Sequence, residues 1–356
     1  MIDKPGASDV PGAHDVQGAQ ETKPKRIIDA TPPRSFKHSI MRWEFMLFAL
    51  FCCIIIININ LSPNFLVAQN LFTNINTFLV RSLVALSMAY CLLLGEIDLS
   101  VGSIVVLTST LLGVVFNTTG SIFLGIVAAL MVGTLCGALN GLILIKFNEL
   151  PAMIVTLGTM ILFRGLAERI LGDGSTGGMR DIEWFAQLYD ARIGPVPYLF
   201  IFFCLLIGVF WFVMHKTPFG RQMFAIGSNR VATNYAGINV SKIRFIVFSI
   251  SGLMCGVSSV FFTSWMGTVR SNVGEGYEIE AIAMCVLGGM STAGGKGTFP
   301  GVVIAIFTIG MLRFGLGLIN VNPQTVRIII GALLITVVTL QNVRLSIGHK
   351  SAAKKA

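Results

Sequence analysis

Long apolar runs alternate with short polar segments along most of the chain. A run of about 20 apolar residues matches the hydrocarbon core of a bilayer, which is about 30 Å thick. These runs are too long for barrel strands and do not alternate with period two, so their backbone is expected to be helical. Ten candidate spans follow, at residues 44–61, 77–94, 101–117, 121–144, 150–170, 198–214, 243–263, 279–293, 298–317 and 324–341. The pattern therefore predicts an all-α polytopic membrane bundle of about ten transmembrane helices.

Three of the runs suggest how the bundle packs. The run at 279–293 is short for a span and could instead form a re-entrant or broken helix. Glycines recur at intervals of four at Gly133 and Gly137 in one run, and at Gly252 and Gly256 in another. Small residues with this spacing allow helices to approach closely in lipid. A compact bundle is the expectation.

Composition agrees with this class. Hydrophobic residues make up 54% of the 356 residues and charged residues 12%, with a mean hydropathy of +0.78. A soluble domain would have about a quarter of its residues charged.

The basic residues indicate an orientation, because segments rich in Lys and Arg stay on the cytoplasmic side. Ten spans with both termini in the cytoplasm place nearly all bases inside: Lys23, Lys25, Arg26, Arg34, Lys37, Arg42, Lys146, Lys216, Arg221, Arg230, Lys242, Arg244, Lys296, Arg344, Lys350, Lys354 and Lys355. The loops predicted to lie outside, 171–197 and 264–278, have more acids than bases. We therefore attribute the net charge of +9 to membrane orientation and expect no nucleic-acid partner.

The ends of the chain differ from its middle. Residues 1–40 are polar and repeat PGASDV and PGAHDV, a composition that cannot bury enough apolar surface to order itself. We expect a disordered cytoplasmic tail over 1–40, a transmembrane permease domain over 41–342 and a basic cytoplasmic tail over 343–356.

One polar stretch is long enough to fold locally. Residues 215–244 contain five Lys or Arg residues and no acid. Their position between two spans predicts a cytoplasmic docking surface for a soluble partner.

No enzyme motif is present. The nearest approach is Gly294-Gly295-Lys296-Gly297-Thr298, in which Gly297 separates the lysine from the threonine that a phosphate-binding loop would need beside it. The seven cysteines lie inside apolar runs and lack the spacing of metal ligands, so no cofactor or metal is expected.

Polar residues inside the spans are the better functional candidates, because they are costly in lipid unless they face a cavity or a partner. By position these are Asn58, Asn60, Arg81, Asn140, Arg164, Glu168, Arg169 and Arg313. Arg164 and Glu168 stand four apart on one helix and could simply pair.

Four sequence blocks resemble a known family. They read GEIDLSVGS at 95–103, LPAMIVTLGTMILFRGLA at 150–167, FGRQMFAIGSNRVATNYAGINV at 219–240 and GYEIEAIAMCVLGGMSTAGGKGTFPG at 276–301. From about residue 40 to about residue 342 the chain is similar to the membrane permease subunits of bacterial ribose-type sugar ABC importers. That group includes relatives for other monosaccharides and for autoinducer-2. Glu96 departs from the family, which more often has an uncharged residue there.

The resemblance implies a plasma-membrane permease without covalent chemistry. Its partners would be cytoplasmic ABC ATPase subunits, an extracytoplasmic solute-binding protein, a second permease copy or a homologous permease, and the surrounding membrane lipid. The basic stretch would contain the coupling helix, beginning near Asn229 and ending at Gly237. The coupling candidates are Gly220, Arg221, Gly227, Asn229 and Gly237, and the pathway or gating candidates are Asp98, Asn140, Arg164 and Glu168. Asp98 could alternatively have only a capping role, with Asp98 itself or Ser100 as the N-cap of the next helix.

Two alternatives stay open at this point. An ion-coupled secondary carrier would place acids or histidines at mid-membrane, whereas the centres of these spans are almost free of acids. An importer for autoinducer-2 would share the same architecture as one for a monosaccharide. The outer loops could meet the binding protein through Asp173, Asp181, Glu183, Arg270 and Glu275.

Overall fold

The computed structural model describes residues 43–61, 65–172, 174–270, 274–322, 324–336 and 339. The predicted tails, 1–40 and 343–356, lie outside this part of the chain. The helices are α2 (Trp43–Leu61), α3 (Ala68–Leu93), α4 (Val101–Thr119), α5 (Ile122–Lys146), α6 (Ala152–Leu171), η1 (Met179–Asp181), α7 (Glu183–Asp190), α8 (Tyr198–Lys216), α9 (Pro218–Ser228), α10 (Arg230–Tyr235), α11 (Val240–Met266), α12 (Tyr277–Leu287), α13 (Phe299–Leu318) and a last helix, Gln324–Thr336. The strands β1 (Arg192–Ile193) and β2 (Val196–Pro197) form a small antiparallel hairpin.

Each predicted span overlaps a helix within the described residues. Seven of these helices are long and apolar enough to cross a membrane: α2, α3, α4, α5, α8, α11 and α13. The prediction of an all-α, multi-pass membrane bundle is confirmed. Helix α6 has 20 residues and bears Arg164, Glu168 and Arg169 among its apolar side chains.

The short run at 279–293 is helical only as far as Leu287. Helix α12 has 11 residues, which at 1.5 Å per residue span about 16 Å, roughly half of the hydrocarbon core. The chain then turns through Gly289, whose φ is +91°, and continues into α13. The structure therefore has a half-length helix at this position, as one of the two sequence readings expected.

Helix α3 is the central element of the bundle. In the most apolar stretch of 18 residues in α3, 89% of the residues are buried. Helices α8, α11, α12 and α13 pack around α3. Leu79, Leu83 and Leu86 are fully enclosed on it. Helix α3 is therefore the buried centre around which these four helices are arranged.

Helices α5 and α11 pack closely through their glycines, with α4 beside both. A Cβ atom at Gly137 would lie 2.2 Å from the Phe248 carbonyl oxygen, and one at Gly252 would lie 2.1 Å from that of Gly133. Only glycine allows this backbone approach. The glycine spacing thus correctly predicted close helix packing.

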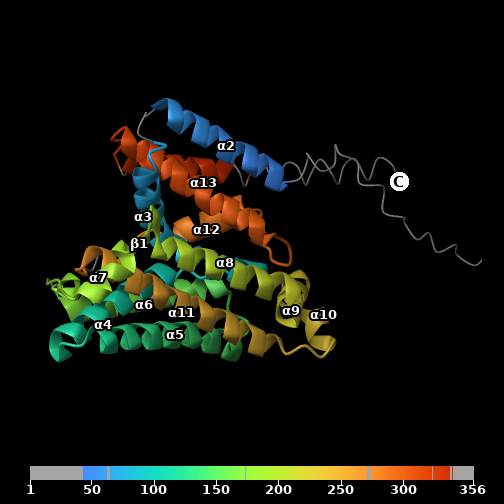
Figure 1. Ribbon diagram of the computed structural model, residues 1–356. Coiled ribbons are helices and arrows are strands. Elements are labelled where there is room, and N and C mark those ends of the chain that lie inside the picture. Colours follow the sequence, from blue (N-terminus) through green and yellow to red (C-terminus); the bar gives the residue numbers. More distant parts are fainter. Residues whose placement is uncertain are drawn as a thin grey trace, which may run out of the picture.

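Helices α2 and α13 lie side by side at one edge of the bundle (Figure 1). Two long-range hydrogen bonds hold α2 in place: Trp43 Nε1 donates to the Leu287 carbonyl at 2.8 Å, and Asn58 Nδ2 donates to that of Met311 at 2.8 Å. Asn58, a polar residue inside a span, is buried and bonded there to neighbouring backbone.

Candidate functional site: a docking surface and a polar cavity

The basic stretch folds into two short helices, α9 and α10. Thr217 Oγ1 accepts a hydrogen bond from the Gly220 amide at 3.3 Å at the start of α9, with Pro218 at the first helical position. Asn229 Oδ1 accepts from the Ala232 amide at 2.9 Å and caps α10, and Gly237 follows with a φ of +81°. The predicted short helix between Asn229 and Gly237 is confirmed. Helix α9, which precedes it, was not distinguished from the sequence.

Two of the coupling candidates face the bundle. A Cβ atom at Gly227 would lie 1.9 Å from the Leu93 carbonyl oxygen and 2.3 Å from the Gly295 amide nitrogen. One at Gly220 would lie 1.9 Å from the Met214 carbonyl oxygen. These glycines therefore seat α9 against the ends of α3 and α8. The other candidates, Arg221, Asn229 and Gly237, are exposed.

Helix α10 presents an apolar face to its surroundings. Val231 is 66% exposed and Tyr235 is 88% exposed, and their spacing of four places them on one side of the helix. Sequence reasoning did not select these two residues. The available signal was an apolar pair four residues apart within an otherwise polar stretch.

A buried acid joins the docking loop to the rest of the protein. Glu96 lies in the turn between α3 and α4 and is 3% exposed. Its Oε1 atom is 2.7 Å from Nε of Arg244, which is 2% exposed, and it also accepts a hydrogen bond from Arg230, the first residue of α10. The stretch 215–244 contains no acid of its own, and two of its three arginines, Arg230 and Arg244, pair with Glu96, which is more than a hundred positions away. The only feature of the sequence that pointed to these ion pairs was Glu96 itself, which departs from the family pattern.

Arg244 extends this cluster to α5. Its NH1 group donates to the Leu144 carbonyl at 2.9 Å and to Asn148 Oδ1 at 2.7 Å. Glu96 and Arg244 together therefore link the α3–α4 turn, the start of α10, the end of α5 and the first turns of α11.

Asp98 belongs to a second buried network. Its Oδ1 accepts from the Ser100 amide at 3.0 Å and from the Ser100 hydroxyl at 2.6 Å, and its Oδ2 accepts from the Ser251 hydroxyl at 3.0 Å. Asn140 Nδ2 donates to Ser100 Oγ at 2.8 Å. Of the two N-cap residues that the sequence offered, Ser100 and not Asp98 occupies the N-cap position of α4, and Asp98 closes a turn before it. The network joins α4, α5 and α11, and the gating role of Asp98 and Asn140 stays a prediction.

The remaining pathway candidates lie on α6. Arg164 NH1 is 4.0 Å from Glu275 Oε1, which belongs to the segment leading into α12. Glu168 is exposed one turn further along α6. Arg164 is thus partly buried and Glu168 exposed, and the pathway role of both residues stays a prediction.

The two loops predicted to lie outside pack against each other. Arg180 NH1 donates to the Ser264 and Trp265 carbonyls at 3.1 and 2.8 Å, and the Thr176 amide donates to the Val269 carbonyl at 3.3 Å. Of the acids proposed for a partner contact, Asp173 lies outside the described residues.

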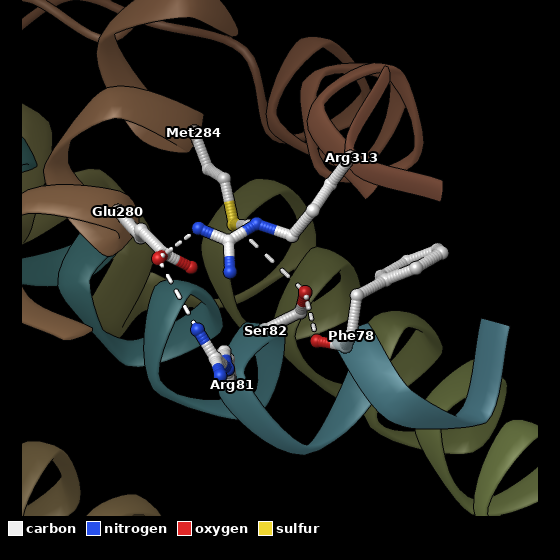
Figure 2. Close-up of polar contacts among 6 residues, drawn as sticks. All are labelled: Phe78, Arg81, Ser82, Glu280, Met284 and Arg313. Atoms are coloured by element: carbon white, nitrogen blue, oxygen red, sulfur yellow. Dashed lines mark hydrogen bonds and ion pairs between the residues drawn. The ribbon is translucent and has the colours of Figure 1, made fainter. Parts of the chain in front are cut away.

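A polar cavity opens between α3 and α13. Its volume is about 310 Å³, and its lining is formed by Asn74, Thr77, Phe78, Arg81, Gly310, Arg313, Phe314, Gly317 and Leu318. Arg81 and Arg313 bind the same carboxylate oxygen, Oε1 of Glu280 on α12, at 3.4 and 2.5 Å. Figure 2 shows the two arginines approaching Glu280 from α3 and α13. The sequence identified both arginines as intramembrane polar residues but did not identify Glu280 as their partner.

These features define the class: a multi-pass membrane protein with a folded basic loop between α8 and α11 and no enzyme motif in its sequence. The family described as "Branched-chain amino acid transport system / permease component" matches residues 70–338, and the chain belongs to it. It is a permease component of the bacterial plasma membrane.

Individual relatives agree with this assignment. The ribose import permease protein RbsC of Haemophilus influenzae is 33% identical over 283 residues, which cover 79% of this chain and 87% of that protein. RbsC of Escherichia coli is 33% identical over 312 residues, covering 87% and 96%. The autoinducer 2 import system permease protein LsrD of Escherichia coli is 33% identical over 319 residues, covering 88% and 95%. No solved structure matches the chain.

Proposed function

We propose that this chain is the membrane subunit of an ATP-driven importer and that its cargo is a monosaccharide. The observation that supports this best is the α9–α10 element, which is seated on the bundle by Gly227 and presents Tyr235 outward. A helix of six residues is marginal alone, so its exposed apolar face is suited to a groove on a partner. That partner is a separate cytoplasmic ABC ATPase, which hydrolyses ATP for the complex.

The proposed topology has ten membrane segments, with α12 as a half-length helix, and both termini in the cytoplasm. The basic residues of the α9–α10 region and Lys146 at the end of α5 support this orientation. The polar segments 1–40 and 343–356 are proposed as cytoplasmic tails of the 41–342 permease domain.

Force transmission follows from the contacts of α9 and α10. When the ATPase pair closes on ATP, each α10 moves with its ATPase. Arg230 on α10 is joined to Glu96 and thereby to the α3–α4 turn, while Gly227 places α9 directly against the end of α3. Movement at the docking surface is thus passed to the central helix of the bundle through these two short contacts. The permease itself performs no covalent chemistry.

The assembly is completed by partners on other faces. A second copy or a homologous permease would share the pathway, with the charged face of α6 as the proposed lining. An extracytoplasmic binding protein would dock on the packed outer loops around α7, where Asp181, Glu183 and Glu275 can steer the encounter.

Autoinducer-2 is the second candidate cargo, because LsrD matches the chain at the same identity as RbsC. The two cargoes are separated by uptake of labelled ribose and of autoinducer-2 into cells that express the complete transport system.

The test of the importer function is co-purification and uptake with an affinity-tagged chain. Wild type is expected to bring down an ABC ATPase, and Tyr235→Asp is expected to lose it while remaining folded, because Tyr235 makes few contacts within the chain. Tyr198→Asp is the matched control, because Tyr198 lies at the start of α8 and the α9–α10 region follows the end of that helix. Uptake that survives ATP depletion but stops when the ion gradient is dissipated would overturn the proposal in favour of a secondary carrier.

A further inference from the structure

We propose that the cavity between α3 and α13 binds an oxyanion, a phosphate or carboxylate group, supplied either by a membrane lipid or by a dissolved solute. This site lies apart from the docking loop and does not depend on the identity of the imported cargo.

The charge around the cavity favours an anionic guest. Arg81 and Arg313 line it, and the carboxylate between them is that of Glu280. Two cations therefore meet one acid in a region of low dielectric constant, where excess charge is costly unless it is paired.

Hydrogen-bond donors remain for such a guest. Each guanidinium has five N–H groups in a planar fork, and Glu280 engages one nitrogen of Arg81 and one of Arg313 through the same oxygen atom. Planar forks of this kind match the oxygens of phosphate and carboxylate. Asn74 and Thr77, on the same face of α3, add polar groups to the lining.

The arginines are held in place before any ligand binds. Arg81 Cζ lies 5.1 Å from the centroid of the Tyr277 ring, which restricts the guanidinium from one side. The Ser82 hydroxyl donates to the Phe78 carbonyl at 2.9 Å and contacts Met284 Sδ at 3.8 Å, which packs α12 against α3 beneath the ion pairs (Figure 2). Preorganised donors of this kind reduce the cost of binding.

Size and shape limit the guest. A volume of about 310 Å³ lies at the small end of the range for ligand sites, and Phe78 and Phe314 form apolar walls. The cavity therefore suits one small anionic group, with any attached apolar part lying against the phenyl rings or outside the mouth. The cavity is lined by the first half of α3. The proposed topology places this half toward the outer side of the membrane.

The experiment uses purified full-length protein, stripped of lipid in a neutral detergent, and has two arms. In the lipid arm, native mass spectrometry measures binding of phosphatidylglycerol against phosphatidylcholine with the same acyl chains. In the solute arm, the thermal unfolding midpoint is followed with added inorganic phosphate against chloride at equal ionic strength. Preference for phosphatidylglycerol alone would identify a lipid headgroup as the source, and a rise with phosphate would identify a dissolved anion.

The variants separate site binding from general charge attraction. Gly317→Leu fills the cavity mouth, and a Cβ atom there meets nothing within 4 Å, so the variant is expected to fold. Gly208→Leu on α8 makes the same change in equally open space away from the cavity. Arg81→Gln removes one fork while Glu280 keeps Arg313 as a partner.

We expect Gly317→Leu and Arg81→Gln to weaken anion binding about tenfold or more, as for loss of a charged hydrogen bond, and Gly208→Leu to leave it unchanged. Absence of anion preference in both arms for the wild type would overturn the proposal. Binding by Gly317→Leu equal to that of the wild type would also overturn it, because the anion would then be held elsewhere.

Discussion

Replacing Glu96 with glutamine removes the negative charge between Arg230 and Arg244 without changing the size of the side chain. Arg244 is 2% exposed and would then be a buried cation without its counterion. Removing one partner of a buried ion pair costs about 3–5 kcal/mol. Because Arg244 keeps its hydrogen bonds to Leu144 and Asn148, we expect the lower end, about 3 kcal/mol.

The two arginines should contribute unequally to the free energy of unfolding. Arg230 exposes 35% of its side chain, so its ion pair is screened by solvent, and Arg230→Gln should cost only about 0–1 kcal/mol. The double variant Glu96→Gln with Arg244→Met removes both buried charges and should recover most of the loss, since apolar replacements of buried pairs are often neutral, within about 1 kcal/mol.

The assay is denaturant unfolding in mixed micelles, followed by tryptophan fluorescence, with the free energy of unfolding compared across the four proteins. The reasoning would be refuted by a cost for Arg230→Gln equal to that of Glu96→Gln. It would also be refuted by a double variant no more stable than Glu96→Gln, because the penalty would then not come from the unpaired Arg244.

Three further predictions concern the docking loop. Tyr235→Ala should lower the yield of co-purified ATPase roughly tenfold, since exposed tyrosines often anchor interfaces, and Tyr198→Ala should not. Asn229→Ala should destabilise α10 by about 1 kcal/mol, seen as faster amide exchange at Ala232, and Asn229→Asp should keep the cap and the slow exchange. Gly227→Ala should cost about 1–3 kcal/mol in unfolding free energy, because its Cβ would lie 1.9 Å from the Leu93 carbonyl oxygen. Equal stability of Gly227→Ala and Gly208→Ala would contradict the close seating of α9.

Local sequence rules were sufficient to locate the apolar helices and to mark both ends of α10. The apolar runs predicted helices at the right positions because the length of a span and the absence of strand periodicity depend only on neighbouring residues. Asn229 and Gly237 correctly marked α10 for the same reason: a cap bonds to an amide three residues away, and a positive φ belongs to one residue. The glycine spacing in α5 and α11 likewise indicated close packing.

The polar clusters could not be predicted in this way. Arg81 and Glu280 are 199 positions apart, and Glu96 lies 134 positions from Arg230. The sequence showed that Arg81 and Arg313 are costly in an apolar setting, but it did not show which residues they or Glu96 meet. Their pairing depends on which helices surround α3 and on the depth at which the half-length α12 begins. Those are properties of packing among whole helices, because close-packed side chains decide register and neighbour only once the bundle has assembled.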